Sequence, residues 1–287
     1  LLEHFWWGSG FIINLPVMAV LVIAGAVVLP ESRDPHPGRF DLVSVGLSMA
    51  AIVPVVYAIK HAVTHGVSWS AGALVVIGLA LGVAFVRRQR RLPDPLLDVS
   101  LFRLPAFSGA VMSTFISMFA MMGLLFFFSQ YLQLVRGYRP LVAGLAELPA
   151  TLASIAVVGV SQRRLGRGPA IAASLLLIAV GLVRIAVTVT ADHYLWLGLA
   201  LVPMGLGVGI ATALSTDTVV SVVVPEKAGA ASAVGETAYE LGAALGIAIL
   251  GSLVTLLYRV HVSLPDGTSA AAATHIADSL ATALPVL

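Results

Sequence analysis

The chain has 287 residues, of which 59% are hydrophobic and 10% are charged, and its mean hydropathy is +1.00. Soluble domains carry roughly 25% charged residues, so this composition excludes an ordinary soluble protein and indicates an integral membrane protein. The formal net charge of +2 gives no reason to expect a nucleic-acid partner. The absence of cysteine excludes a disulfide framework and thiol chemistry.

Apolar runs follow one another along the chain, and a run of about 20 residues can cross a bilayer as a helix. We therefore expect an all-α, polytopic membrane protein with about eight transmembrane helices. In chain order the runs are Phe11–Leu29, Leu42–Ala62, Ala71–Val86, Phe107–Leu132, Leu141–Val160, Ala170–Val189, Leu195–Leu214 and Ala228–Leu257. Prolines mark several of their ends, because proline lacks the backbone donor that a helix needs.

Basic residues cluster in alternate loops, around residues 33–39, 87–103, 163–167 and 227. Since cytoplasmic loops are enriched in Lys and Arg, we assign these loops to the cytoplasm and both ends of the chain to the outside. The run Arg87-Arg88-Gln89-Arg90-Arg91 is then a topology anchor that touches anionic lipid, not a nucleic-acid site. Residue 1 is Leu and no signal peptide is visible, so we expect a natural protein that begins upstream.

Two glutamates, Glu236 and Glu240, lie four residues apart inside the last apolar run, where charge is costly and usually functional. This spacing places both on one helix face, roughly 6 Å apart. Like charges this close in a poorly solvated site cannot both ionise readily, so we expect at least one to hold a proton near neutral pH. Such a carboxyl can exchange its proton for a cationic substrate. The alternative is that one of them pairs with a buried cation or caps a neighbouring helix.

Three further charged residues lie in the runs. Glu147 is expected about 9 Å inside its helix and is a third candidate site; its alternative is an acid near the outer surface, paired with Arg136 or Arg139. Asp217, near a cytoplasmic helix end, is either an interfacial charge or a secondary site residue. Arg184 either extends its side chain to the outer surface or is the counter-ion of a glutamate.

Aromatic and methionine side chains gather in the fourth run, and such side chains suit a promiscuous pocket for flat organic cations. With one residue from the last run, the expected lining is Phe115, Phe119, Met122, Phe126, Gln130, Tyr131 and Tyr239. The alternative is ordinary lipid-facing or helix-packing surface. Neither a zinc-protease motif nor a nucleophile elbow occurs, so we expect no enzyme, no metal and no cofactor.

Four stretches resemble one family, the fourteen-helix drug:proton antiporter branch of the major facilitator superfamily. They are Phe5–Pro16, Pro95–Arg103, Gln130–Leu145 and Lys227–Gly242, and they occur in the family's order. The resemblance implies a fragment covering about helices six to thirteen, incomplete at both ends. Residues 1–30 would be the last helix of the N-terminal half and residues 31–92 two linker helices. Residues 93–287 would be a C-terminal half without its last helix, with an outer loop over residues 259–287.

The resemblance also implies a function: proton-coupled efflux of lipophilic cationic drugs across the bacterial inner membrane by alternating access, with a monomeric full-length protein. Its partners would be protons, a small-molecule substrate and the bilayer. Glu147 and the Glu236/Glu240 pair would lie on the middle helices of two inverted repeats, where midplane binding sites are expected. The segment around the pair is similar to the acidic pattern of the quaternary-ammonium efflux pumps, although Gly235 stands where some of them have another acid.

Two other hypotheses remain. On the same fold, the cargo could be a neutral or anionic natural product or metabolite, in which case Arg184 would matter more. A membrane scaffold or sensor without transport is disfavoured, because it would place three acids in the membrane without using them.

Overall fold

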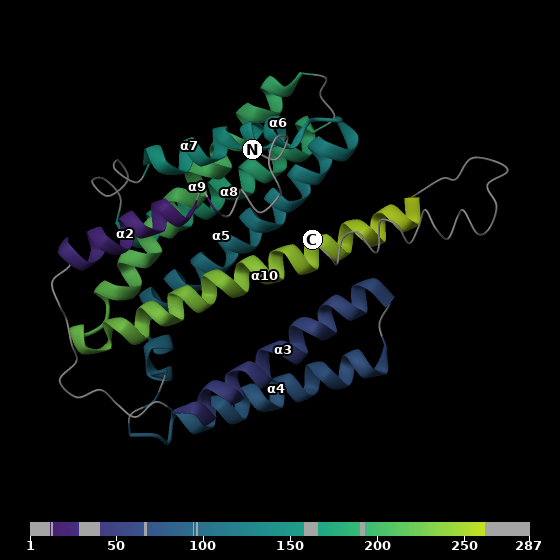
Figure 1. Cartoon of the computed structure of the whole chain (residues 1–287). Coiled ribbons are helices and arrows are strands. Elements are labelled where there is room, and N and C mark those ends of the chain that lie inside the picture. The colour runs from purple at the N-terminus through teal and green to yellow at the C-terminus, as the bar shows by residue number, and fades with distance from the viewer. Residues whose placement is uncertain are drawn as a thin grey trace. The chain divides into compact units, whose positions relative to one another are not determined.

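A computed structural model describes residues 12, 14–28, 41–65, 68–93, 95, 97–157, 166–189 and 193–261, apart from the side chains of 63–65, 134, 226, 252 and 254–261. All regular elements in these residues are helices, which confirms the expected all-α class. The chain divides into two units, Leu1–Arg39 and Phe40–Leu287. The first contains α2 (Asn14–Val28), and the helices described below belong to the second (Figure 1).

The second unit contains the helices α3 (Leu42–His65), α4 (Trp69–Gln89), α5 (Pro105–Gln130), α6 (Pro140–Ala146), α7 (Leu148–Val157), α8 (Arg167–Thr188), α9 (Tyr194–Ser221) and α10 (Ala228–His261). The 3₁₀ turns η1 (Val99–Arg103) and η4 (Pro225–Lys227) precede α5 and α10, and the π-helical segment η2 (Tyr131–Val135) continues α5. The two helices expected as linkers, α3 and α4, lie in the same unit as α5 to α10.

Seven helical segments of the described residues are long and apolar enough to cross a membrane. They correspond to the second to eighth expected runs, with α6 and α7 together forming one span, Pro140–Val157. The first expected run is present as α2, which has 15 residues in the described part and is shorter than a span. The segment expected as an outer loop begins inside α10, which continues to His261, and its remainder lies outside the described residues.

Local sequence explains where several helices begin. Pro105 and Pro140 stand in the first turns of α5 and α6, where a missing backbone donor costs nothing. Ser68 caps α4, its hydroxyl accepting a hydrogen bond from the backbone N–H of Ala71 at 3.2 Å. Gly137, with φ of 65°, occupies the turn before α6, a conformation that costs glycine nothing.

Glu147 interrupts the fifth span. Its backbone N–H donates to the carbonyl of Gly144 at 3.2 Å, which closes α6. Pro149 has no backbone donor and therefore stands in the first turn of a new helix, α7, instead of continuing α6. The interruption places Glu147 at a junction between two helices, not in the middle of one.

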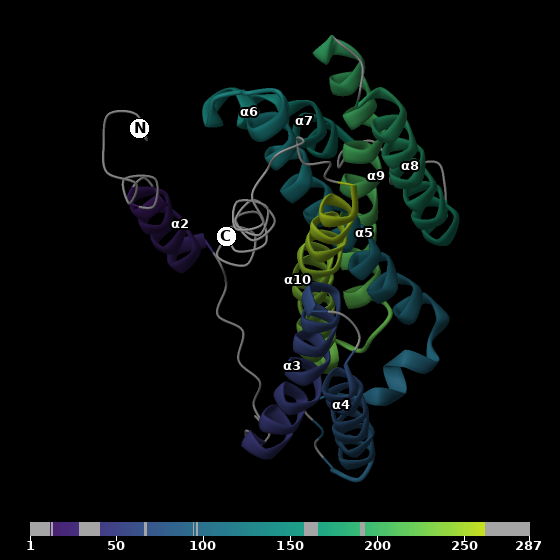
Figure 2. The same cartoon turned by 90° about the vertical axis from the view of Figure 1, so that its right-hand side faces the viewer.

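Helix α5 packs against both α9 and α10, while α7 and α8 pack against α9 (Figures 1 and 2). Glycines permit these close contacts. A Cβ added at Gly207 of α9 would lie 2.6 Å from the Ser174 carbonyl of α8, and one at Gly242 or Gly246 would overlap the backbone of α5. The hairpin of α3 and α4 packs against α10 through α3. This arrangement puts α10 beside three other helices of the unit.

Among the described residues, three ion pairs join helix ends that the Lys and Arg pattern assigns to the cytoplasm: Arg88–Asp41, Arg167–Asp217 and Lys227–Asp98. The Arg88–Asp41 pair makes the most additional hydrogen bonds. Asp41 accepts from both Nη2 and Nε of Arg88 and from the hydroxyl of Ser44 at 2.6 Å. The Ser44 hydroxyl also accepts from Nε2 of the buried Gln89 at 2.7 Å, so the start of α3 is tied to the end of α4.

Candidate functional site

A small polar cavity surrounds Glu236. It has a volume of about 120 Å³ and lies between α5, α9 and α10. Its lining consists of Thr114, Thr216, Val219, Val220, Ser232, Gly235, Glu236 and Tyr239, and four of these eight residues carry a hydroxyl group. A space of this size holds a few water molecules, and hydroxyls can hydrogen-bond both to those waters and to a carboxyl group. The cavity therefore gives Glu236 a polar environment inside an apolar span.

Glu236 and Glu240 lie on one face of α10, as expected, and both are exposed in this unit. Neither forms an ion pair or a side-chain hydrogen bond with any residue that the structure describes. Counting from Ala228, at 1.5 Å per residue, Glu236 lies about 12 Å and Glu240 about 18 Å along the helix. The apolar span begins at Ala228 and extends at least to Gly251, within a helix that continues to His261, so both glutamates lie inside the span.

Unpartnered hydroxyls lie in the helix interface close to this cavity. Ser113 and Ser117 of α5 and Ser215 of α9 are buried without a hydrogen-bond partner among the described residues. Ser113 and Ser215 adjoin the cavity residues Thr114 and Thr216 in sequence, and α5 packs against α9. Polar atoms of this kind are usually satisfied by water when they are buried. The interface next to Glu236 is thus more polar than its surroundings.

Glu147 lies apart from this cavity, at the junction of α6 and α7, and it is half-buried. Its carboxylate forms no ion pair with any described residue, which leaves the expected alternative of a pair with Arg136 or Arg139 without support. The neighbouring Ala146 carbonyl accepts a hydrogen bond from the Tyr194 hydroxyl at 2.6 Å. Among the three glutamates, only Glu236 lines the polar cavity.

The two secondary candidates lie elsewhere. Asp217 pairs with Arg167 at 2.8 Å, and Arg167 also donates to the Ser221 hydroxyl at 3.0 Å, which joins the start of α8 to the end of α9. This geometry favours the interfacial alternative for Asp217. Arg184 is exposed on α8 and pairs with none of the described glutamates.

The residues expected to form an aromatic pocket do not lie together in one place. Phe115 and Phe119 stack with ring centroids 6.4 Å apart, and Phe126 makes an edge contact with Phe127, not with that pair. Tyr239 is the member that shares the cavity of Glu236. Met122 and Gln130, on the same helix α5, are half-buried. The described residues thus bring one of the seven expected side chains together with a glutamate.

Tyr131 belongs to a separate network near the opposite end of α5. Its hydroxyl donates to the Val189 carbonyl at 2.6 Å and accepts from Nε of Arg136 at 3.1 Å. The guanidinium of Arg136 also lies over the Tyr131 ring, 5.7 Å from its centroid. The Tyr131 hydroxyl bond is the main reason why the pKa of Arg136 is raised above its ordinary value. These contacts fix η2 against the end of α8.

Thr114 and Thr216 were not among the residues expected from the sequence. Each lies on a different helix from Glu236, and a threonine inside an apolar run is common, so no local signal marks them. The cluster of Asp41, Ser44, Arg88 and Gln89 was missed as well. Here a signal exists, because an Asp before a span with a Ser three residues later is a helix-cap pattern.

Comparison of the sequence with known proteins identifies a family that matches most of the chain. Residues 1–247 match the family described as Major Facilitator Superfamily. The chain is 40% identical over 271 residues to the multidrug efflux pump LfrA of Mycolicibacterium smegmatis, covering 93% of this chain and 54% of that protein. It is 31% identical over 274 residues to the methyl viologen resistance protein SmvA of Salmonella typhimurium, covering 94% of this chain and 55% of that protein.

A further relative is the tetracenomycin C resistance and export protein of Streptomyces glaucescens, which is 31% identical over 276 residues, covering 93% of this chain and 50% of that protein. The chain thus spans about half the length of the curated relatives that it matches.

Proposed function

Because this chain belongs to the major facilitator superfamily, a family of membrane transporters and not of enzymes, we propose that it is part of a drug efflux pump. The proposed activity is export of lipophilic cationic drugs across the bacterial inner membrane in exchange for protons. The names of the relatives support drug efflux, since two of them are called a multidrug efflux pump and a methyl viologen resistance protein. Proton coupling and a cationic cargo rest on the residues of α10.

The observation that carries the proposal is the pair of carboxyls on α10 that have no ion-pair partner among the described residues. Glu236 lines a cavity of about 120 Å³ with four hydroxyl-bearing side chains, and Glu240 lies one turn further on the same face. An acid held in an apolar span without a counter-charge is stable when protonated, or when a cation replaces the proton. A cation and a proton would then compete for the same carboxyls, which is the requirement for exchange.

Transport would follow alternating access, in which the two halves of such a protein rock around a site near the membrane middle. With the site open to the outside, protons neutralise the carboxyls and release the cation. With the site open to the cytoplasm, proton loss restores the negative charge that binds the next cation. The position of Glu236 and Glu240 inside the apolar span of α10, away from its start at Ala228, supports this scheme.

The test is ethidium efflux from cells that carry the pump with its natural flanking sequence. The Glu236→Gln, Glu240→Gln double variant should lose efflux driven by a proton gradient, because an amide neither exchanges a proton nor attracts a cation. Ala244→Gln is the matched control, since it adds an amide to the exposed face one turn beyond Glu240 and removes no acid. Undiminished efflux by the double variant at equal expression would refute the proposal.

A second candidate keeps the fold and changes the cargo to a neutral or anionic natural product. The relative named for tetracenomycin C resistance and export is the observation that favours it. Proton release on substrate addition separates the two candidates. Cationic compounds should release protons from the purified pump if the carboxyls bind them, whereas neutral compounds should release none.

A further inference from the structure

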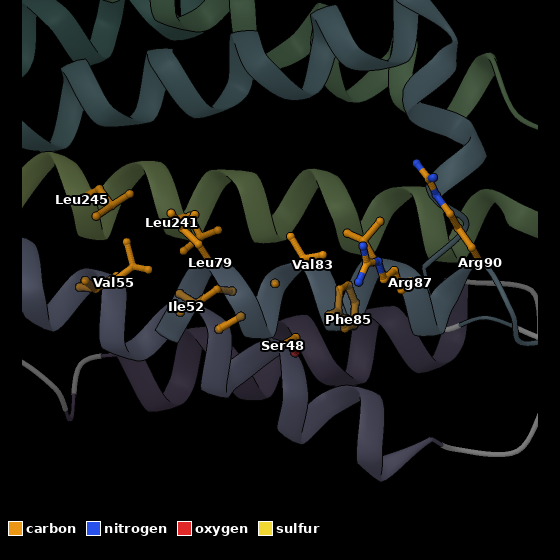
Figure 3. A pocket seen from close by; sticks show the side chains of 15 residues that line it. Ser48, Ile52, Val55, Leu79, Val83, Phe85, Arg87, Arg90, Leu241 and Leu245 are labelled. Carbon is orange, nitrogen blue, oxygen red and sulfur yellow. The ribbon is translucent and has the colours of Figure 1, made fainter. Parts of the chain in front are cut away.

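An apolar groove separates the α3–α4 hairpin from α10. It has a volume of about 660 Å³, and Figure 3 shows its lining. Aliphatic side chains from three helices form the walls, namely Ile52 and Val55 of α3, Leu79 and Val83 of α4, and Leu241 and Leu245 of α10. Arg87 and Arg90 lie together at one end of the groove (Figure 3). The groove is therefore apolar along its length and positively charged at one end.

The dimensions of the groove suit a lipid chain. Its α4 wall runs from Gly78 to Arg90, a helical length of about 18 Å, and one leaflet of the hydrocarbon core is about 15 Å thick. An adjoining cavity of about 510 Å³ shares Ser48, Ile52, Phe85 and Leu241 with the groove and continues to Phe115 of α5. Two adjoining apolar spaces that meet on shared walls can hold the two acyl chains of one phospholipid.

The charges identify the headgroup. Within the basic run, Arg88 is bound to Asp41, whereas Arg87 and Arg90 form no ion pair with any described residue. They stand in the last turn and the C-cap of α4, at the end that the Lys and Arg pattern assigns to the cytoplasm. Basic pockets between transmembrane helices at that surface attract anionic lipid headgroups.

The same charges disfavour the other occupants. A lipophilic cation, the cargo proposed above, would be repelled by two guanidinium groups. A second copy of the chain related by a two-fold axis along the membrane normal would bring four arginines to the same level of one interface. A phospholipid with a negative headgroup satisfies both the apolar walls and the charged end.

We propose that the groove between α3, α4 and α10 binds one anionic phospholipid of the cytoplasmic leaflet, with its headgroup on Arg87 and Arg90. This site is separate from the polar cavity of Glu236, because the groove and that cavity share no lining residue. Its occupancy does not depend on which compound the pump exports.

The experiment is native mass spectrometry of the membrane-extracted protein, together with its melting temperature in added phosphatidylglycerol or phosphatidylcholine. We expect the protein to retain one phosphatidylglycerol and to melt at a higher temperature with it than with phosphatidylcholine. The Arg87→Gln, Arg90→Gln double variant should bind phosphatidylglycerol about 25-fold more weakly, since each basic residue near an anionic headgroup contributes about fivefold.

Two further variants complete the test. Arg91→Gln, Arg103→Gln removes the same charge from exposed positions outside the groove and should leave binding unchanged within about twofold. Gly82→Leu should block the lipid by filling the groove, because a Cβ there meets only the Ala51 Cβ, at 3.9 Å, so the hairpin accepts it.

Four outcomes overturn the proposal. Equal binding of phosphatidylglycerol and phosphatidylcholine would show that Arg87 and Arg90 do not select the headgroup. An equal loss of binding in the Arg91→Gln, Arg103→Gln variant would show that only general surface charge attracts the lipid. A wild-type protein that retains no lipid, or that appears as a dimer abolished by Gly82→Leu, shows that protein and not lipid fills the groove.

Discussion

Asp98 and Lys227 form an ion pair across 129 positions of the chain. Asp98 also caps η1, accepting from the backbone N–H of Ser100 at 2.9 Å, and Lys227 ends η4, directly before α10. The pair therefore fixes the start of α10 to the turn that precedes α5. Since α5 and α10 pack along each other, it sets the register of the two helices at this end.

We predict a pH-dependent loss of stability on removing this pair. The bonds from Lys227 and Ser100 lower the pKa of Asp98 to about 2, below its ordinary value. A lowered pKa in the folded state contributes stability at pH values above about 4, and this contribution disappears as the pH falls towards 2. Asp98→Asn should cost about 1 kcal/mol at neutral pH, because the side chain of Lys227 is 49% exposed and solvent screens the pair.

The measurement is the melting temperature of the wild type and of Asp98→Asn between pH 2 and pH 6. The two curves should converge at the acid end. Arg103→Gln, an exposed change in the same turn, should run parallel to the wild type throughout. A difference between wild type and Asp98→Asn that is constant with pH would contradict the role given to the carboxylate.

We predict that the two glutamates of α10 have separable effects. Glu236 lines the hydroxyl-rich cavity, which suits proton exchange through water, whereas Glu240 lies outside it on the open face, which suits contact with the cargo. Glu236→Gln should abolish the dependence of efflux on the proton gradient. Glu240→Gln should instead raise the substrate concentration for half-maximal efflux about tenfold, the effect of losing one charge–cation contact.

Efflux from proteoliposomes at several pH gradients and ethidium concentrations distinguishes these effects. Tyr239→Phe is a useful comparison, because it removes one hydroxyl from the cavity and keeps both carboxyls. Identical defects in the two single variants would mean that the carboxyls act as one coupled site, and the division of roles would be wrong.

Loss of the hydroxyl should reduce stability much more at one buried serine than at another. Ser44 and Ser117 are both 0% exposed. The Ser44 hydroxyl donates to Asp41 and accepts from Nε2 of Gln89, so Ser44→Ala removes the acceptor of that buried Nε2 group and should cost about 1–3 kcal/mol. The Ser117 hydroxyl has no partner among the described residues, so Ser117→Ala should change stability by less than about 0.5 kcal/mol.

Denaturant unfolding in mixed micelles measures both free energies of unfolding under the same conditions. A loss for Ser117→Ala as large as that for Ser44→Ala would show that Ser117 is held by an ordered water. That result would extend the polar region around Glu236 into the α5–α9 interface.

Much of the fold follows from composition and local pattern. Seven of the eight expected runs correspond to helices that can span a membrane, because a bilayer forces each apolar run to satisfy its own backbone hydrogen bonds. Helix ends at Pro105 and Pro140 also follow from local chemistry. The fifth run was predicted as one span, Leu141–Val160, and its break at Glu147 could not be predicted, since the sequence does not say whether Pro149 bends a helix or starts a new one.

The shared face of Glu236 and Glu240 was determined by the sequence alone, because helical periodicity fixes the angle between residues four apart. The sequence could not determine what surrounds that face. Thr114 and Thr216 reach the Glu236 cavity only because α5 and α9 pack against α10, with Gly242 and Gly246 allowing the close approach of α5. Periodicity is a property of one helix, whereas a site is a property of several, and contacts between distant segments depend on how side chains fit.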